Sequence, residues 1–196
     1  IKLTTHSHFI REILRLYVAL SGLKDVGASL SELKSAVGDI FNNPIKGFGV
    51  LSGYAGKRIR NTTGLGTDRI LSKLDPALQP AAKIYEKYTV ELAKAADELL
   101  RLHGKKVTEE QYQLKRLGDI TIELFVGLCT LSRADALQKA GDPYAAQAIR
   151  IATLHAQAAK RRMATHIRAM ARNEDEERDA LASFALEQGV YPWDVI

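Results

Sequence analysis

Cysteine, proline and aromatic residues are scarce in this chain, and long hydrophobic runs are absent. Its 196 residues include one cysteine and five prolines, and aromatic residues make up 7%. Because Cys129 is alone, no disulfide can form within the chain, which is typical of a reducing compartment. The most apolar stretch, residues 120–131, is shorter than the roughly 20 residues that span a bilayer. No secretory signal pattern opens the sequence. We therefore expect a protein of the cytoplasm or an organelle matrix, or one held peripherally on a membrane.

The excess of basic over acidic residues is confined to one segment. The formal net charge is +5, and residues 41–74 hold six basic residues against one acid, so the rest of the chain sums to zero. The same segment contains six of the 14 glycines, which disfavours long helix. A local basic excess indicates a local anionic partner and argues against a nucleic-acid-binding domain.

Helical periodicity dominates the sequence, and strand patterns are scarce. Three long helices are predicted, over residues 76–103, 108–140 and 143–172. Shorter helices are predicted over residues 9–23, 29–37 and 174–187, with another near 50–61. Short connections between long helices favour antiparallel neighbours. The sequence therefore predicts an all-α, up-down antiparallel helical bundle of three long helices plus shorter terminal helices.

Specific residues mark the ends of these helices. Asp75 before Pro76 predicts an N-cap with proline at the first helical position, and Gly104 and Gly141 predict stops. Thr108 with Gln111 predicts a capping box at the start of the second long helix.

The second long helix is predicted to be the central and most buried one. Between residues 120 and 131 it is apolar nearly all round, so Cys129 is expected to act as a small buried hydrophobe. Glu123 has no partner of opposite charge on its own helix. It is expected to pair with an arginine or histidine of residues 143–172, or to face solvent.

No motif for catalysis, metal binding or phosphate binding is evident. The five histidines include no pair at helical i, i+3 or i+4 spacing and no HExxH motif, so no metal site is predicted. Residues 64–66, Gly-Leu-Gly, lack the flanking pattern of a phosphate loop.

Two segments carry a resemblance to a known family. Residues 12–22 read EILRLYVALSG, and residues 109–137 read EEQYQLKRLGDITIELFVGLCTLSRADAL. Together they resemble the C-terminal part of the very-long-chain acyl-CoA dehydrogenases. The resemblance implies three parts: a remnant of the end of a dehydrogenase domain (1–23), a basic Gly-rich connecting segment (24–74) and a helical bundle domain (75–196).

The resemblance also implies that the chain is not itself an enzyme. In this family a Glu-Gly-Thr-Asn sequence, whose Glu is the catalytic base, precedes the first segment; here His8, Phe9, Ile10 and Arg11 occupy those positions. We therefore expect no catalytic or cofactor-binding residue, with FAD bound only in a full-length relative. The implied role is interaction with a protein partner, a second copy or a membrane surface. The alternative is that the chain is a fragment of an active FAD-dependent long-chain acyl-CoA dehydrogenase.

The basic segment is the first candidate for such contact. Aromatic groups beside cations suit an anionic membrane surface or a docking partner. The residues predicted to make this contact are Lys46, Phe48, Tyr54, Lys57, Arg58 and Arg60. The alternative is an ordinary solvated loop over the bundle.

A second candidate is a slot for a long apolar acyl ligand inside the bundle. Facing apolar stripes suggest its lining: Tyr85, Tyr88, Leu92, Leu117, Leu124 and Leu128. Small residues opposite, Ala152, Ala156 and Ala159, would leave room. The alternative is that these side chains form plain hydrophobic core.

Overall fold

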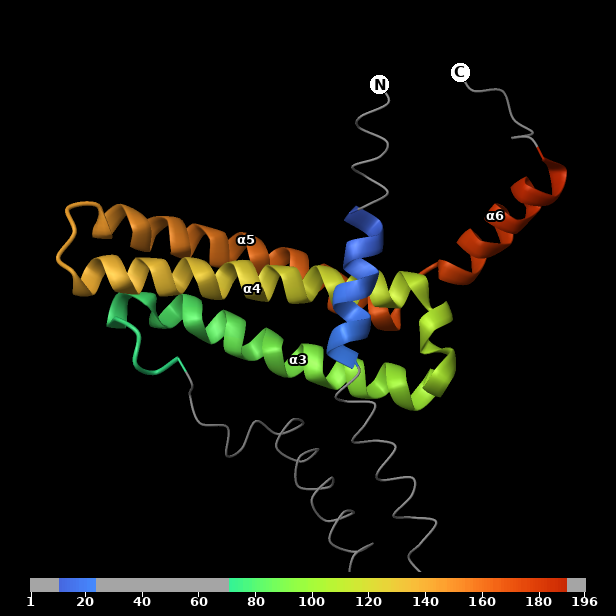
Figure 1. Ribbon diagram of the computed structural model, residues 1–196, viewed down its shortest axis with the longest axis horizontal. Helices are drawn as coiled ribbons and strands as arrows, with labels where there is room; N and C mark the ends of the chain where they lie inside the picture. Colours follow the sequence, from blue (N-terminus) through green and yellow to red (C-terminus); the bar gives the residue numbers. More distant parts are fainter. Residues whose placement is uncertain (1–10, 24–70, 190–196) are drawn as a thin grey trace, which may run out of the picture.

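The computed structural model describes residues 11–23 and 71–189, and within these ranges every regular element is helical. Three long helices lie side by side: α3 (Gln79–His103), α4 (Gln111–Lys139) and α5 (Ala145–Ala171). The helix of residues 11–23 crosses α4, and α6 (Asp175–Gln188) projects from one end of the bundle (Figure 1). The predicted all-α up-down bundle is confirmed. The predicted helices at 29–37 and 50–61 lie outside the described residues.

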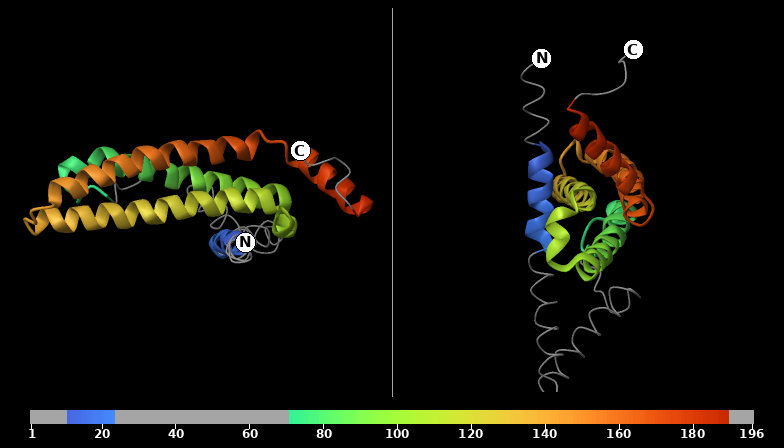
Figure 2. Two further views of the ribbon diagram at one scale, coloured as in Figure 1. Left: turned by 90° about the horizontal axis from the view of Figure 1, so that it is seen from above. Right: turned by 90° about the vertical axis from the view of Figure 1, so that its right-hand side faces the viewer.

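Small side chains on α5 let the three long helices pack closely. Ala152, Ala156 and Ala159 recur at helical spacing and are almost completely buried. They lie in one hydrophobic cluster with Tyr85 of α3 and Met163 of α5, which fill the space that the alanines leave. Figure 2 shows the same three helices from two further directions, with α4 lying between α5 and the crossing helix 11–23. The core therefore runs along the length of α4.

Tyr85 packs onto the backbone of α4 at a position that only glycine permits. A Cβ atom built on Gly127 would lie 2.1 Å from Cε1 of Tyr85. The Tyr85 ring is buried, and its hydroxyl lies 2.9 Å from Nδ1 of His155 on α5. One tyrosine therefore connects all three long helices.

The start of α3 is fixed by two aspartates. Oδ1 of Asp75 accepts a hydrogen bond from the N–H of Ala77 at 2.9 Å, as predicted for a cap. The cap opens a 3₁₀ turn, η1 (Pro76–Leu78), and α3 follows with Pro80 in its first turn. Oδ1 of Asp135 on α4 accepts from the N–H of Asp75 at 2.8 Å, which ties this turn to the far end of α4.

The predicted capping box is wrong. Residues 104–109 form a 3₁₀ helix, η2 (Gly104–Glu109), so α4 begins at Gln111 after Glu110 and has no side-chain cap. Gly104 and Gly141, at φ 55° and 66°, do end the preceding helices as predicted. The tight 3₁₀ connection takes up the residues that the pattern assigned to the first turn of α4.

Helix α4 is the most buried of the three long helices, as predicted, with nine buried residues against six in α3 and five in α5, but its apolar stretch is not covered all round. Phe125 is 68% exposed, Val126 is 42% exposed, and Cys129 is exposed rather than buried. The physical reason is that α3 and α5 cover only part of the circumference of α4 along this stretch. An apolar run that is wider than its covered face must place some side chains outside the core.

Leu124 and Leu128 allow a matched test of this assignment, because they lie one turn apart on α4 and are 7% and 39% exposed. Leu124→Ala should lower the free energy of unfolding by roughly 2–5 kcal/mol, as expected for a buried leucine. Leu128→Ala should cost less than about half of that. Urea unfolding measures both. Equal costs would show that the two faces of α4 are wrongly assigned.

Gly127→Ala should destabilise the bundle, because the added methyl group overlaps the Tyr85 ring. Overpacking of this kind lowers the free energy of unfolding by about 1–3 kcal/mol. This loss exceeds the roughly 0.5–1 kcal/mol by which Gly→Ala stabilises a helix where the added methyl group is unhindered. Gly22→Ala is the control, since its Cβ would meet nothing within 4 Å. Thermal unfolding should show a lower midpoint for Gly127→Ala and an equal or higher one for Gly22→Ala. The reverse order would refute the close approach of Tyr85.

Candidate functional site

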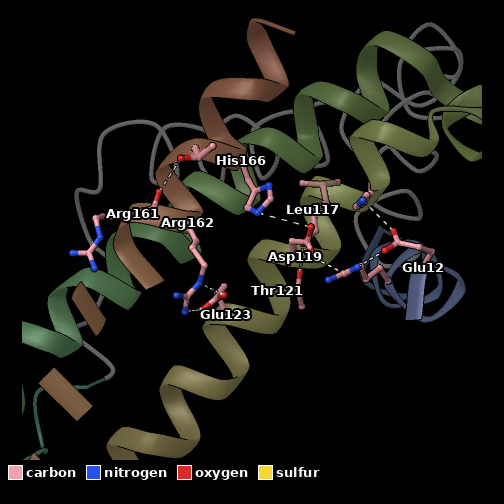
Figure 3. A network of polar contacts seen from close by, with 11 residues as sticks. Glu12, Leu117, Asp119, Thr121, Glu123, Arg161, Arg162 and His166 are labelled. Carbon is pink, nitrogen blue, oxygen red and sulfur yellow. Dashed lines mark hydrogen bonds and ion pairs between the residues drawn. The ribbon is translucent and has the colours of Figure 1, made fainter. Parts of the chain in front are cut away.

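The most connected polar feature of the bundle is a row of charged side chains on α4. Arg116, Asp119 and Glu123 are three and four residues apart, so they lie on one side of the helix. Each contacts a different element: Arg116 reaches α6, Asp119 lies between helix 11–23 and α5, and Glu123 reaches α5. Figure 3 shows Asp119 and Glu123 in this network. We call these three residues the α4 polar row.

Glu123 and Arg162 form an ion pair between α4 and α5, which is one of the two arrangements expected for Glu123 from the sequence. The Nε and Nη2 atoms of Arg162 donate to the two carboxylate oxygens of Glu123, at 2.5 and 2.7 Å. This fork geometry is the stronger form of an arginine–carboxylate pair.

Burial, and then the nearby Glu123 carboxylate, raise the pKa of Tyr85 to about 12. Tyr85 is therefore a neutral phenol at neutral pH, which suits a structural hydrogen bond to His155.

Asp119 contacts two basic side chains, of which one is charged at neutral pH. Nε of Arg15 lies 2.6 Å from Oδ1 of Asp119, and Nε2 of His166 lies 3.8 Å from Oδ2. Burial lowers the pKa of His166, although Asp119 acts in the opposite direction. The imidazole is therefore neutral at pH 7, and Arg15 supplies the positive charge.

Helix 11–23 is held on α4 by backbone proximity as well as by charge. A Cβ built on Gly118 would lie 2.5 Å from the carbonyl oxygen of Arg15, so this crossing also requires glycine. Glu12 pairs with Arg15, and its other carboxylate oxygen lies 3.2 Å from Nζ of Lys115. This crossing could not be predicted from the sequence, because a glycine inside a helix gives no indication of which segment approaches it.

The α4 polar row is suited to joining helices. Each of its members is paired with a side chain of another element. Asp135 instead accepts from the backbone N–H of Asp75, and its pKa is lowered by the Lys139 ammonium of its own helix and by that N–H. Within residues 11–23 and 71–189, no three potential metal ligands gather at one place.

The residues predicted to line an acyl slot do not share one environment. Tyr85, Tyr88 and Leu124 are buried in one cluster, with Leu92 packed against it. Leu117 belongs to a second cluster nearer helix 11–23, and Leu128 is 39% exposed. Ala152, Ala156 and Ala159 lie in the first cluster, with Tyr85 packed among them. The acyl slot stays a prediction. The six predicted contact residues from Lys46 to Arg60 lie outside the described residues.

A surface that sequence reasoning missed lies between α4 and α5. Phe125, Val126, Cys129 and Ile151 line a shallow groove there, together with Arg133. Leu154 follows one turn after Ile151 and is 71% exposed. We call Phe125, Val126, Cys129, Ile151 and Leu154 the α4/α5 apolar face. Its indication in the sequence was the all-round apolar run of α4, which was interpreted as deep burial.

A comparison with known protein families identifies the family to which this bundle belongs. The family profile "ACAD9/ACADV, C-terminal domain" matches residues 76–188, more than half of the 196 residues. The chain belongs to this family. The match covers the described bundle from η1 to the end of α6.

Curated relatives of this family agree. The mitochondrial very long-chain specific acyl-CoA dehydrogenase of Homo sapiens is 38% identical over 135 residues, which is 68% of this chain and 20% of that protein. Those of Mus musculus and Bos taurus are both 36% identical over the same shares of each chain. The resemblance stated from residues 12–22 and 109–137 is thereby confirmed. The matched part spans about a fifth of the length of these relatives.

None of the described helices of this family member is long and apolar enough to cross a membrane. The longest, α4, has 29 residues, but its seven charged side chains leave no uncharged run longer than residues 124–132. A span requires about 20 consecutive, mainly apolar residues.

His166 provides a test of the polar network. Because the pKa of His166 is lowered in the folded state, its neutral form contributes to the free energy of unfolding. That contribution is fully present above about pH 6.5, the ordinary pKa of histidine, and is lost as the pH falls through the pKa in the folded state. An NMR titration of the imidazole C–H resonances should give a midpoint below 6.5. Asp119→Asn should lower the midpoint further, because it removes the charge that favours the protonated form. A midpoint above 6.5 would contradict burial as the dominant cause.

Proposed function

We propose that this chain is a non-catalytic interaction domain of an acyl-CoA dehydrogenase-type protein, and that it binds a protein or membrane surface through the α4/α5 apolar face. The observation that carries the proposal is the exposure of large side chains at adjoining positions. Phe125, Ile151 and Leu154 are 68%, 62% and 71% exposed. Exposed apolar side chains that gather in one patch mark interaction surfaces more often than isolated ones do.

Basic residues of the groove and of α5 indicate the charge of the partner. Arg133 lines the groove itself, and Arg150 precedes Ile151 on α5. Over its whole length α5 contains five lysine and arginine residues and no acid. An acidic protein segment and an anionic membrane surface both fit this combination of apolar and positive groups.

A non-catalytic role is consistent with how the perturbed ionisable groups are used. Tyr85 is bonded to His155, Asp135 holds the start of α3, and His166 lies beside Asp119. Each of these contacts joins two elements of the bundle. In this proposal the flavin and the dehydrogenase chemistry belong to the part of a longer protein that corresponds to the remaining length of the relatives.

The purified chain should therefore be colourless and inactive. After desalting, it should show no flavin absorption band and no turnover of an acyl-CoA with an electron acceptor. A flavin band that persists through desalting, or measurable turnover, would overturn the non-catalytic assignment.

Binding through the face is tested with a double variant, Ile151→Asp with Leu154→Asp. Self-association by analytical ultracentrifugation and cosedimentation with anionic vesicles are the two readouts, and the variant should weaken whichever of them the unmodified chain shows. Leu102→Asp is the control, because Leu102 is 71% exposed on the last turn of α3 and lies outside the face. Vesicle binding should also fall as salt rises, because charge attraction is screened over about 8 Å at physiological ionic strength. A chain that neither self-associates nor binds vesicles contradicts the proposal.

A further inference from the structure

We infer that the partner of the α4/α5 apolar face is an acidic amphipathic helix of another protein, which lies lengthwise along the outer side of α5. This inference rests on the proposed function and names the chemistry of its partner. The outer side of α5 carries Arg150, Leu154, Arg161 and Arg168, at spacings of four, seven and seven residues. Such spacings keep side chains on one side of a helix. All four side chains are exposed, and we call them the α5 outer stripe.

The described part of the chain leaves the arginines of this stripe without an acid. Arg162 forms the fork with Glu123, and Figure 3 shows that its neighbour Arg161 points in a different direction. Among residues 11–23 and 71–189, no carboxylate forms an ion pair with an arginine of the stripe. The other residues of the chain contain eight lysines and arginines and five acids. They therefore supply no excess of acid that would neutralise the stripe.

The spacing of the stripe selects a helix as the partner. Leu154, Arg161 and Arg168 are seven residues apart, so each lies about 10.5 Å from the next along the axis, at roughly 1.5 Å per residue. A second helix that presents one apolar residue and two acids at the same heptad spacing would contact all three side chains. Arginine binds carboxylates through paired hydrogen bonds, so aspartate or glutamate suits the positions opposite Arg161 and Arg168. The apolar residue would pack on Leu154 and Ile151, where the stripe joins the α4/α5 apolar face.

Other anionic partners fit the stripe less well. A nucleic acid would pair with the arginines but would leave Ile151 and Leu154, which are 62% and 71% exposed, in water. An anionic membrane would cover these two side chains, but it would repel the three acids in the first turn of α6, which begin seven residues after Arg168. Helix α6 of a second copy has no two acids seven residues apart. These partners are therefore alternative outcomes of the test.

The first experiment measures how labelled helical peptides bind to the whole chain, by fluorescence anisotropy. The spaced peptides have about 20 residues, enough for a helix on an alanine and glutamine background. They carry one leucine followed, or preceded, by two glutamates at successive intervals of seven residues. The control peptide has the same composition, with its glutamates on the side opposite the leucine. One spaced peptide should bind roughly tenfold more tightly than the control, because the control cannot reach both arginines while its leucine is docked.

Charge reversal tests the two arginines. Arg161→Glu with Arg168→Glu should weaken binding of the spaced peptide by roughly tenfold or more. A peptide with lysines in place of its glutamates should bind this variant and not the unmodified chain, because it meets unlike charges only there. Lys83→Glu with Lys106→Glu is the matched control, since both lysines are exposed, lie outside α5 and change the net charge equally. Circular dichroism should give unchanged helix content for both double variants.

Competition links the peptide to the proposed function. Anionic vesicles also offer apolar and negative groups, so the spaced peptide should displace the chain from them and the control peptide should not. A chain that binds vesicles or self-associates through Ile151 and Leu154, but shows no preference for a spaced peptide, would overturn the inference and leave the proposed function standing. A chain that binds neither peptides nor vesicles and does not self-associate would overturn both.

The peptide results decide the inference itself. Binding of the spaced peptide that persists in Arg161→Glu with Arg168→Glu would overturn it, as would a lysine peptide that fails to bind this variant. A preference for the spaced peptide that requires both arginines and follows the reversed charges would establish the α5 outer stripe as the site of an acidic helix.

Discussion

The structure depends on how closely α3, α4 and α5 approach one another, and this approach is set by small residues. Ala152, Ala156 and Ala159 form the contact surface of α5, and Gly127 lets the Tyr85 ring lie against α4. Interiors are packed to crystal-like density, so replacing these residues with larger ones would move whole helices. Tyr85 and the α4 polar row then hold the helices in register, because each polar contact joins different elements.

The same packing limits what the bundle can cover. Three long helices in close contact bury one side of α4 and leave another side in water. The apolar run of residues 120–131 is wider than the covered side, so Phe125 and Val126 remain exposed beside Ile151. We regard this surplus as the functional feature of the domain, because a chain that needed only a stable bundle would place polar residues there.

Sequence patterns predicted the features that depend on neighbours along the chain. The Asp75 cap and the glycine stops were correct because each depends on local geometry. The pairing of Glu123 across helices was one of the two arrangements expected from the sequence, since an acid facing the core of an apolar helix requires a partner of opposite charge.

Features that depend on tertiary contacts could not be predicted in this way. Periodicity does not state how many helices will surround α4, so Cys129 was expected to be buried and is exposed. The approach of Arg15 to Gly118, and the lack of buried residues in α6, depend on segments far apart in the sequence. At the start of α4, the 3₁₀ connection replaced a capping box whose residue spacing was suitable.

Contact through the α4/α5 apolar face can be tested through the reactivity of Cys129. The thiol is exposed in the single copy, so a chromogenic disulfide reagent should modify it rapidly in dilute protein. The measurement is the modification rate per thiol as the protein concentration rises at constant reagent excess. If the α4/α5 apolar face is the contact surface, the rate falls over the concentration range in which the chain associates, because the bound partner covers the groove. A rate that stays constant while the chain associates would show that the contact lies elsewhere on the molecule.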